Sequence, residues 1–301
     1  MVEEQNKGVF LMSDYLVRGV GANKQFRVFA AITTALVEEA RRRHDTWPVA
    51  SAALGRTLTA GLLLGANLKG TDLLTLRILG DGPVGAIVVT AKASGEVKGY
   101  IQEPHVDLPS PAAGKLPVGD AVGQGFLYVT KDMGLKEPFT GNVELASGEI
   151  GEDVARYLLM SEQTPSAVAL GVLVSPDCRV MASGGIIIQM LPNASEDVLA
   201  HIEESLEKMA PVSSLVSRGM TAEKIVASAV GGLEVRFLEK APVRFKCGCS
   251  RERIKDILAA LGREEIEKIC REQEKAEVHC HFCGELYTFT GLELENIIKQ
   301  L

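Results

Sequence analysis

Cysteine is the residue type whose spacing in this sequence points most directly to chemistry. Six cysteines occur among 301 residues; one is Cys178, and five lie between positions 247 and 283. They include the pair Cys247-Gly248-Cys249 and, after thirty intervening residues, Cys280-His281-Phe282-Cys283. Each pair is local, and folding of the segment between them can bring the two pairs together. Two such pairs are typical of a metal site.

Zinc is the metal that this donor set favours. Four thiolates in a tetrahedral array suit Zn²⁺, with bonds of about 2.3 Å. The sequence therefore predicts one zinc ion bound by Cys247, Cys249, Cys280 and Cys283. Four protein ligands leave no open coordination position, so we do not expect a catalytic metal.

Two histidines beside Cys280 and two further cysteines could also donate to a metal. His279 and His281 flank Cys280 and could replace one thiolate, but four cysteines already complete the shell. We therefore interpret both histidines as exposed neighbours. Cys178 and Cys270 are interpreted as small side chains without a ligand role.

Oxidation would change such a site. A thiolate attacked by peroxide becomes a sulfenic acid, which condenses with a neighbouring thiol, and here each paired sulfur has a neighbour one or two residues away. A segment of about sixty residues has too little core to dispense with its metal, which contributes about 10–16 kcal/mol in small zinc peptides. Loss of the metal would turn a redox event into unfolding. The competing hypothesis is a purely structural zinc.

The elements before the cysteines predict an α+β core domain over residues 1–192, of which 1–12 are a loose extension. Apolar spacing of three and four predicts helices over 24–43, 49–68 and 152–160. Period-two patterns and turn residues predict a mostly antiparallel sheet. Its expected strands are 73–79, 86–91, 96–101, 124–131, 142–146, 167–174, 179–182 and 186–191.

Two further regions follow this core. Residues 193–241 read as a linker of short amphipathic helices, each too short to be stable alone, so they must pack on another surface. The apolar face of the first helix carries Val198, Leu199, Ile202, Leu206 and Met209. Residues 242–301 form the expected zinc domain, with helices in its charged middle, a strand at 287–289 and a closing helix over 292–299.

Composition narrows the classes of function. The chain is 46% hydrophobic with a net charge of −7, which is typical of a globular protein and unfavourable for coating nucleic acid or anionic membranes. It has no apolar run of 18 residues and no signal-peptide pattern near Met1. We therefore expect a cytoplasmic protein.

Enzymatic and nucleotide-binding alternatives find little support. Gly80-x-Gly82-x-x-Gly85 matches a dinucleotide fingerprint, but a strand-like Ala86–Thr90 follows where a helix should begin, so we predict a hairpin turn. The sequence contains no phosphate-loop, Gly-x-Ser-x-Gly or His-Glu-x-x-His motif. The histidines show no spacing typical of a proton relay: His44, His105, His201, His279 and His281. We expect that the protein is not an enzyme.

A nucleic-acid-binding protein with a structural zinc is the main alternative. Arg244, Lys246, Arg251 and Arg253 cluster around the first cysteine pair. However, residues 242–301 hold ten basic and eleven acidic side chains, a poor balance for contacting phosphates. We interpret the four cations as offsetting the negative charge of zinc and four thiolates.

Several stretches together resemble a known family, the redox-regulated thirty-three-kilodalton heat-shock chaperones of bacteria. The resemblance covers the chain from about Asp14 onward and includes both cysteine pairs. The other stretches are Arg42–Pro48, Ala53–Thr57, Gly80–Gly85 and Gly184–Pro192.

The resemblance implies a cytoplasmic holdase with an α+β core, a helical linker and a separate four-cysteine zinc domain. The reduced form would bind zinc and be inactive. The oxidised form would contain the disulfides Cys247–Cys249 and Cys280–Cys283, release zinc and unfold its linker and zinc domain. It would then bind unfolding client proteins without ATP, typically as a homodimer.

Overall fold

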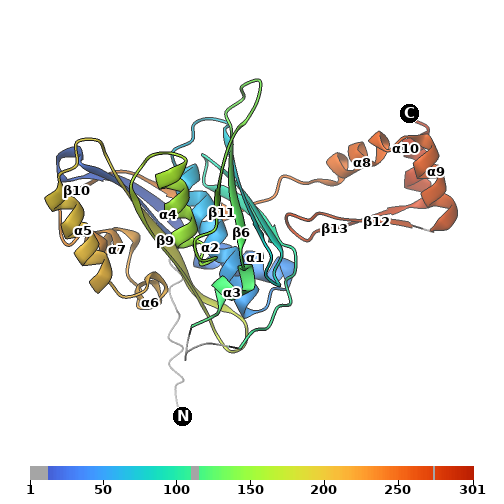
Figure 1. The fold of residues 1–301 in the computed structure, drawn as a ribbon. Helices are drawn as coiled ribbons and strands as arrows, with labels where there is room; N and C mark the ends of the chain where they lie inside the picture. The colour runs from blue at the N-terminus through green and yellow to red at the C-terminus, as the bar shows by residue number, and fades with distance from the viewer. Residues whose placement is uncertain (1–12, 110–114, 274) are drawn as a thin grey trace, which may run out of the picture. The chain divides into compact units, whose positions relative to one another are not determined.

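The structure, a computed structural model, describes residues 13–109, 115–273 and 275–301. The expected loose extension, residues 1–12, lies outside them. The chain divides into two units, one ending at Phe245 and the other beginning at Lys246. Helices combine with mostly antiparallel sheets, as the α+β prediction required (Figure 1).

Two sheets build the first unit. One has the antiparallel strand order β10-β1-β2-β9-β8. Its strands are β1 (Tyr15–Gly21), β2 (Phe26–Ile32), β8 (Ser166–Val174), β9 (Val180–Met190) and β10 (Val235–Pro242). The other has the order β11-β5-β4-β3-β6-β7, with only β11 and β5 parallel. Its strands are β3 (Leu73–Gly80), β4 (Ala86–Lys92), β5 (Glu96–Ile101), β6 (Gly125–Asp132), β7 (Phe139–Glu144) and β11 (Arg244–Phe245).

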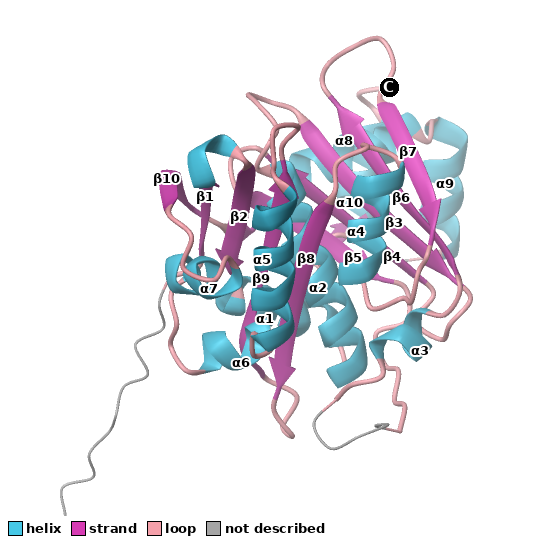
Figure 2. Ribbon diagram, turned by 60° about the vertical axis from the view of Figure 1, so that its left-hand side comes forward, coloured by secondary structure: helices cyan, strands magenta, loops and turns pink. Residues whose placement is uncertain are grey.

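Helix α2 (Pro48–Gly65) lies between the two sheets and contacts strands of both (Figure 2). Apart from Arg56, which pairs with Glu149, its residues are apolar or small on every side, a pattern that requires burial almost all round. Gly61 permits the close approach, because a Cβ atom there would lie 2.8 Å from a methyl carbon of Val89. The resulting core joins α2 to the inner faces of both sheets.

The expected helix over 24–43 was wrong in its first half. That half consists of the short 3₁₀ turn η1 (Ala22–Lys24) and β2, and α1 (Thr34–His44) begins only afterwards. Both faces of β2 are buried: Phe26 and Val28 point to one side, and Phe29 to the other. A strand covered on both faces is apolar along nearly its whole length, here interrupted only by Arg27, so its residues also satisfied the helical spacing.

Most other elements of the first unit match the prediction. The glycines at 80–85 form the turn between β3 and β4. The two strands expected over 179–182 and 186–191 are one continuous strand, β9, and β1 was not predicted. Strand β7 begins and ends earlier than expected. Two helices are described between β5 and β8, α3 (Val118–Val122) and α4 (Gly151–Met160), of which only α4 was predicted.

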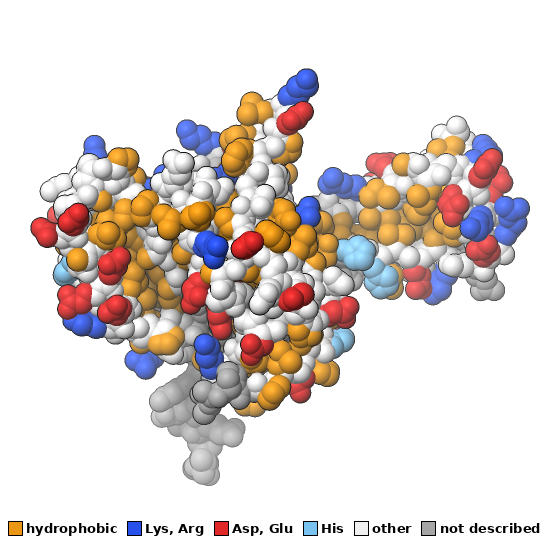
Figure 3. All heavy atoms as spheres, in the orientation of Figure 1, with side chains coloured by type: hydrophobic (Ala, Val, Ile, Leu, Met, Phe, Trp, Pro, Cys, Tyr) orange, Lys and Arg blue, Asp and Glu red, His pale blue; other side chains and the backbone are white. Residues whose placement is uncertain are grey.

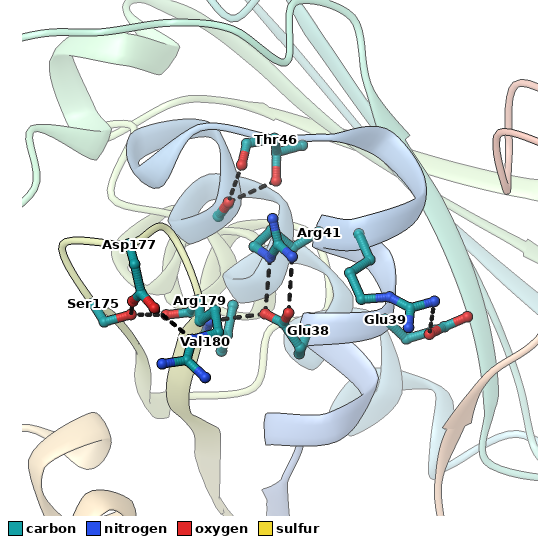
Figure 4. Close-up of polar contacts among 10 residues, drawn as sticks. Glu38, Glu39, Arg41, Thr46, Ser175, Asp177, Arg179 and Val180 are labelled. Carbon is teal, nitrogen blue, oxygen red and sulfur yellow. Dashed lines mark hydrogen bonds and ion pairs between the residues drawn. The ribbon is translucent and has the colours of Figure 1, made fainter.

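Basic residues at the end of α1 are neutralised within the fold. Arg41 donates two hydrogen bonds of 2.9 Å to Glu38, and Arg43 forms an ion pair of 2.7 Å with Glu39 (Figure 4). Glu38 also accepts a hydrogen bond of 2.8 Å from the backbone N–H of Val180, which ties α1 to the start of β9. The positive run therefore stabilises local structure.

Three short helices cover the outer face of the β10-β1-β2-β9-β8 sheet. They are α5 (Glu196–Lys208), α6 (Val212–Ser217) and α7 (Ala222–Ala229). Their apolar side chains pack with Tyr15, Val28 and Ile188 in a second hydrophobic cluster. On α5 only Ile202 is fully buried, while Leu199 is 37% exposed.

Residues 193–241 are not helical throughout, contrary to the sequence-based expectation. From Val235 the chain forms β10, which pairs antiparallel with β1 at the edge of the sheet. Only the edge position explains the exposed pattern of β10, which does not alternate as a half-buried strand would.

The second unit has a small hydrophobic core of its own. Its elements are α8 (Arg251–Ala260), α9 (Arg263–Glu272), β12 (Lys275–His279), β13 (Leu286–Thr290) and α10 (Gly291–Ile298). The residues of the core that are buried are Ile254, Leu258, Ile266, Ala276, Phe289, Leu294 and Ile297. Strands β12 and β13 form an antiparallel hairpin, of which only β13 was expected.

Candidate metal centre

Two loops of the second unit present the paired cysteines. Cys247 and Cys249 precede α8, whose first turn is capped by Ser250 accepting a hydrogen bond of 3.2 Å from the Arg253 N–H. Cys280 and Cys283 lie in the turn between β12 and β13. That turn is closed by a hydrogen bond of 2.8 Å from the Gly284 N–H to the Cys280 carbonyl. Helix cap and hairpin thus set the position of each pair.

The four sulfurs converge. Every Sγ atom of Cys247, Cys249, Cys280 and Cys283 lies within 4.8 Å of the others. The Cys247 and Cys280 sulfurs are 3.7 Å apart, and those of Cys249 and Cys283 are 3.3 Å apart. Bonds of about 2.3 Å to a tetrahedral ion would place sulfurs roughly 3.8 Å from one another. The cluster could therefore hold a metal ion.

The environments of the sulfurs differ. Cys283 is 3% exposed, and its burial raises the thiol pKa well above the usual range. Burial also raises the pKa of Cys247. Burial acts in the same direction on Cys249, but hydrogen bonds from the Tyr287 hydroxyl (3.2 Å) and from neighbouring thiols outweigh it and lower the pKa. The phenol thus stabilises the thiolate form of Cys249.

Tyr287 was not recognised from the sequence as part of the site. It appeared only as a residue of an expected aromatic strand. Recognising a hairpin here would have been the signal. Tyr287 lies in β13, which pairs with β12 across the hairpin whose turn carries Cys280 and Cys283. Only this pairing brings its hydroxyl to the sulfur of Cys249, 38 positions away in the chain.

The other candidate ligands lie outside the cluster. Among the residues that the structure describes, it comprises four cysteines and neither His279 nor His281. Cys270, on α9, packs beside the hydrophobic core of the second unit. Cys178 belongs to the first unit, in the turn where its N–H donates 2.9 Å to the carbonyl of Ser175.

Two of the cations near the first cysteine pair have carboxylate partners. Arg244 pairs with Glu96 at 2.7 Å, and Arg251 pairs with Glu293 at the same distance. The Arg251 guanidinium also lies 4.4 Å from the centre of the Phe289 ring. Both cations are therefore engaged in ion pairs within the fold, which does not favour a phosphate-binding surface.

Comparison with known proteins identifies the family. The model of the family described as Hsp33 protein matches residues 14–290. This chain belongs to the Hsp33 family. It is 57% identical over 290 residues to the 33 kDa chaperonin of Desulforamulus reducens, covering 96% of this chain and 99% of the relative. A 33 kDa chaperonin of Bacillus cereus is 48% identical over 291 residues, covering 96% of this chain and 100% of the relative.

A solved Hsp33 structure has the same fold. The crystal structure of the 33 kDa chaperonin from Thermotoga maritima superposes with a TM-score of 0.90 at 34% identity. The alignment covers 96% of this chain and 99% of that structure. Membership of the Hsp33 family supports a chaperone role for this chain and confirms the resemblance drawn from its motifs. Within the described ranges, no helix is long and apolar enough to cross a membrane.

Proposed function

We propose that this protein is a redox-regulated, ATP-independent holdase that protects unfolding proteins from aggregation during oxidative and thermal stress. The observation that carries the proposal is the convergence of four cysteine sulfurs in a unit with little other core. In the reduced form Cys247, Cys249, Cys280 and Cys283 would hold one zinc ion, and the chaperone would be inactive. When bound, zinc would cross-link the two loops and hold the sulfurs as thiolates.

Peroxide supplies the activating chemistry in this proposal. One thiolate of a pair attacks a peroxide oxygen, the O–O bond breaks, and the sulfur becomes a sulfenic acid while hydroxide leaves. The neighbouring thiol then displaces the sulfenic oxygen, which leaves as water, and a disulfide forms. Each disulfide consumes one peroxide. The chain would contain the disulfides Cys247–Cys249 and Cys280–Cys283 and would no longer offer four thiolates to a metal.

Short loops favour this pairing once the metal has left. The recorded sulfur contacts of 3.7 Å and 3.3 Å run across the two pairs. A local disulfide, however, closes a loop of only a few residues and costs less chain entropy than a crossed one. Trypsin can cut after Lys246 and Arg251, so mass spectrometry can separate the outcomes: local disulfides leave the two pairs on unlinked peptides, and crossed disulfides join them.

The linker would open when the second unit unfolds. Residues 193–241 comprise α5 to α7 and most of β10, and β11 follows directly before Lys246. They are held by the apolar faces of α5 to α7 and by a polar contact at α7. There Glu223 accepts a hydrogen bond of 2.7 Å from the Tyr15 hydroxyl and pairs with Lys240 at 3.0 Å. None of these helices exceeds 13 residues, so none would persist without its packing.

Release of the linker would uncover an apolar sheet face for clients. Phe26, Val28, Ile186 and Ile188 lie beneath α5 to α7 and are each at most 1% exposed in the closed form. A groove of about 510 Å³ already borders this region between α4 and α5. Hydrophobic side chains gather near it (Figure 3). An enlarged apolar surface of this kind binds unfolded chains without sequence preference.

We further propose a cytoplasmic protein without enzymatic activity, whose active form is a homodimer and which binds neither nucleic acid nor membranes. The net charge of −7 supports the last point. A nucleic-acid-binding protein with a structural zinc remains the alternative hypothesis. Binding to nucleic acid that weakens steeply with salt would revive it.

One experiment tests the proposal directly. Peroxide is added to the reduced, zinc-loaded protein under mild warming while a colorimetric chelator reports zinc release. Far-UV circular dichroism and light scattering by an aggregating client are followed on the same sample. We expect zinc release, loss of helix and suppression of aggregation to occur together. Zinc that stays bound, or leaves without any gain in client binding, would refute the redox switch.

A further inference from the structure

Strand β10 is held to the sheet mainly by its backbone. It is the outermost strand, and its side chains point largely into solvent, with Phe237 38% and Leu238 53% exposed. An ion pair of 2.6 Å joins Glu239 of β10 to Arg18 of β1, and the side chains of both residues are nearly half exposed. Such pairs contribute about 1 kcal/mol or less. Strand β10 therefore buries little apolar surface of its own.

An irregularity further weakens the β1–β10 ladder. The register shifts between Arg18 and Gly19, which pair with Glu239 and Phe237 and leave Leu238 without a partner residue. A bulge of this kind leaves one residue unpaired and locally disrupts the ladder. The ladder is thus interrupted near its middle.

Strand β1, in contrast, is anchored independently of β10. Tyr15, Leu16 and Val17 are each 7% exposed or less. The whole length of β1 also pairs with β2, from Tyr15 opposite Ile32 to Gly21 opposite Phe26, without a register shift. If β10 leaves, β1 stays in place and presents a row of unpaired N–H and C=O groups, which is a template for another strand.

We propose that the free edge of β1 binds an extended segment of an unfolded client by antiparallel strand addition. Strand β10 occupies in the closed form the place that the client takes in the active form. The inference rests on the proposed function, since it requires release of the linker. Main-chain pairing needs no particular client sequence, which suits a protein that binds many unfolded chains.

The surroundings of the edge define the preferred segment. On one side β10 places Glu239 and Ala241 at a small cavity of about 230 Å³, whose lining also includes apolar Leu16 and Leu62 and basic Arg18, Lys69 and Lys92. Alternate residues of an added strand would face it in place of Glu239 and Ala241, so a carboxylate and a small apolar side chain should be preferred there. Arg18, which pairs with Glu239 in the closed form, would favour an acidic residue opposite. The fitting partner is an extended segment that places a carboxylate and a small apolar side chain on this face.

Hydrogen-bond direction provides a selective test. The Ala22 N–H donates 3.1 Å to the Glu234 carbonyl, and the Val243 N–H donates 3.2 Å to the Asp14 carbonyl. Because backbone groups alternate along a strand, the even-numbered residues of β1 point their N–H groups toward β10. Val20 is one of them, and its register partner is Arg236. Proline at position 20 removes the N–H donor on the β1 side of this residue pair, and proline at position 236 removes the donor on the β10 side.

The two prolines should have different effects. Val20→Pro and Arg236→Pro both weaken the closed ladder, so both should activate at lower peroxide than the wild type. Only Val20→Pro damages the edge that clients would use. Once activated, we expect Val20→Pro to bind a permanently unfolded client about fivefold more weakly than Arg236→Pro, the equivalent of one backbone hydrogen bond. Equal affinities of the two activated variants would overturn the inference.

A peptide of residues 234–243 gives a second measurement that does not depend on folding of the variants. It should bind the oxidised wild-type protein, compete with client, and bind about fivefold more weakly when it carries Arg236→Pro. A peptide that fails to compete would contradict the inference, as would a cross-link in the activated protein between β10 of one copy and β1 of another. Wild-type protein that gains no activity on oxidation would instead refute the proposed function.

Discussion

At the scale of single residues, Tyr287 is the least expected contributor to the metal centre. Its hydroxyl donates a hydrogen bond of 3.2 Å to the sulfur of Cys249. Groups that hydrogen-bond to metal ligands orient them and commonly change metal affinity by about 10–100-fold. The hydrogen bond is therefore expected to retain the metal as well as to position the sulfur.

Tyr287→Phe should weaken zinc binding by about tenfold and accelerate zinc release to a competing chelator, because the Cys249 sulfur loses its donor. Thiol labelling and competition with a chelator, both on the reduced protein, would measure the change in zinc binding. Thr288→Val, one residue along the same strand, is the matched control and should behave as wild type. Equal zinc affinities of the Tyr287 variant and the wild type would contradict this role.

Asp14 is a buried carboxylate whose environment should make the stability of the fold depend on pH. It accepts hydrogen bonds from the N–H groups of Leu36 (2.6 Å) and Ala35 (3.2 Å) at the start of α1. Burial outweighs these hydrogen bonds and raises its pKa from 3.8 to about 6. The folded protein therefore binds this proton more tightly than the unfolded chain does.

The sign of the effect follows from this difference in pKa. The contribution of Asp14 to the free energy of unfolding is largest below about pH 4 and is lost as the pH rises through 6, with an upper bound of about 3 kcal/mol. Asp14→Asn should remove this dependence. Urea titrations between pH 4 and 7 would show the wild type losing stability relative to the variant. Parallel curves would show that Asp14 titrates normally.

At the scale of elements, α5 is the least firmly packed of the longer helices on the first unit. Its one fully buried residue is Ile202, beside which Val198 and Leu206 pack more loosely against the sheet. Burial of a few apolar side chains is all that opposes the conformational entropy of its 13 residues. This balance makes α5 a good candidate for early release.

Ile202→Ser combined with Leu206→Ser should loosen the linker by at least about 2 kcal/mol, since a buried aliphatic side chain is lost. The reduced, zinc-loaded variant should then suppress aggregation without peroxide. Leu199→Ser, at a position that is 37% exposed, is the control and should stay inactive until oxidised. If the double variant is as inactive and as stable as wild type when reduced, the linker is not the latch.

At the scale of the whole molecule, the two units differ in what stabilises them. The first unit has two hydrophobic clusters built on two sheets. The second has one small cluster and the cysteine centre. Removal of the metal should therefore affect the second unit much more strongly than the first.

Chelation of zinc from the reduced protein should abolish the thermal transition of the second unit and leave that of the sheets of the first unit nearly unchanged. Differential scanning calorimetry before and after chelation would resolve the two transitions. Cysteine-to-serine substitution at position 270, outside the cluster, is the control and should retain both. A single, unshifted transition after metal removal would show that the metal does not stabilise this unit.

The sequence alone indicated the residues of the candidate site. Cysteine spacing singled out four residues, and the tertiary structure brings their sulfurs together. Local patterns also predicted α2 and the hairpin of β3 and β4, because turn residues and apolar periodicity act within a few positions. Motifs scattered over the chain indicated the family, which the comparisons confirm.

Only the tertiary structure decided features that depend on distant partners. Strand β2 was mistaken for helix because its two covered faces remove the alternation that marks a strand. Strand β10 was missed because an edge strand is defined by its pairing with β1, more than 200 positions away in the chain. The contact of Tyr287 with Cys249 arises from a hairpin in the same way. Pairing between distant segments leaves no periodic pattern in the local sequence, so it can be recognised only in the folded structure.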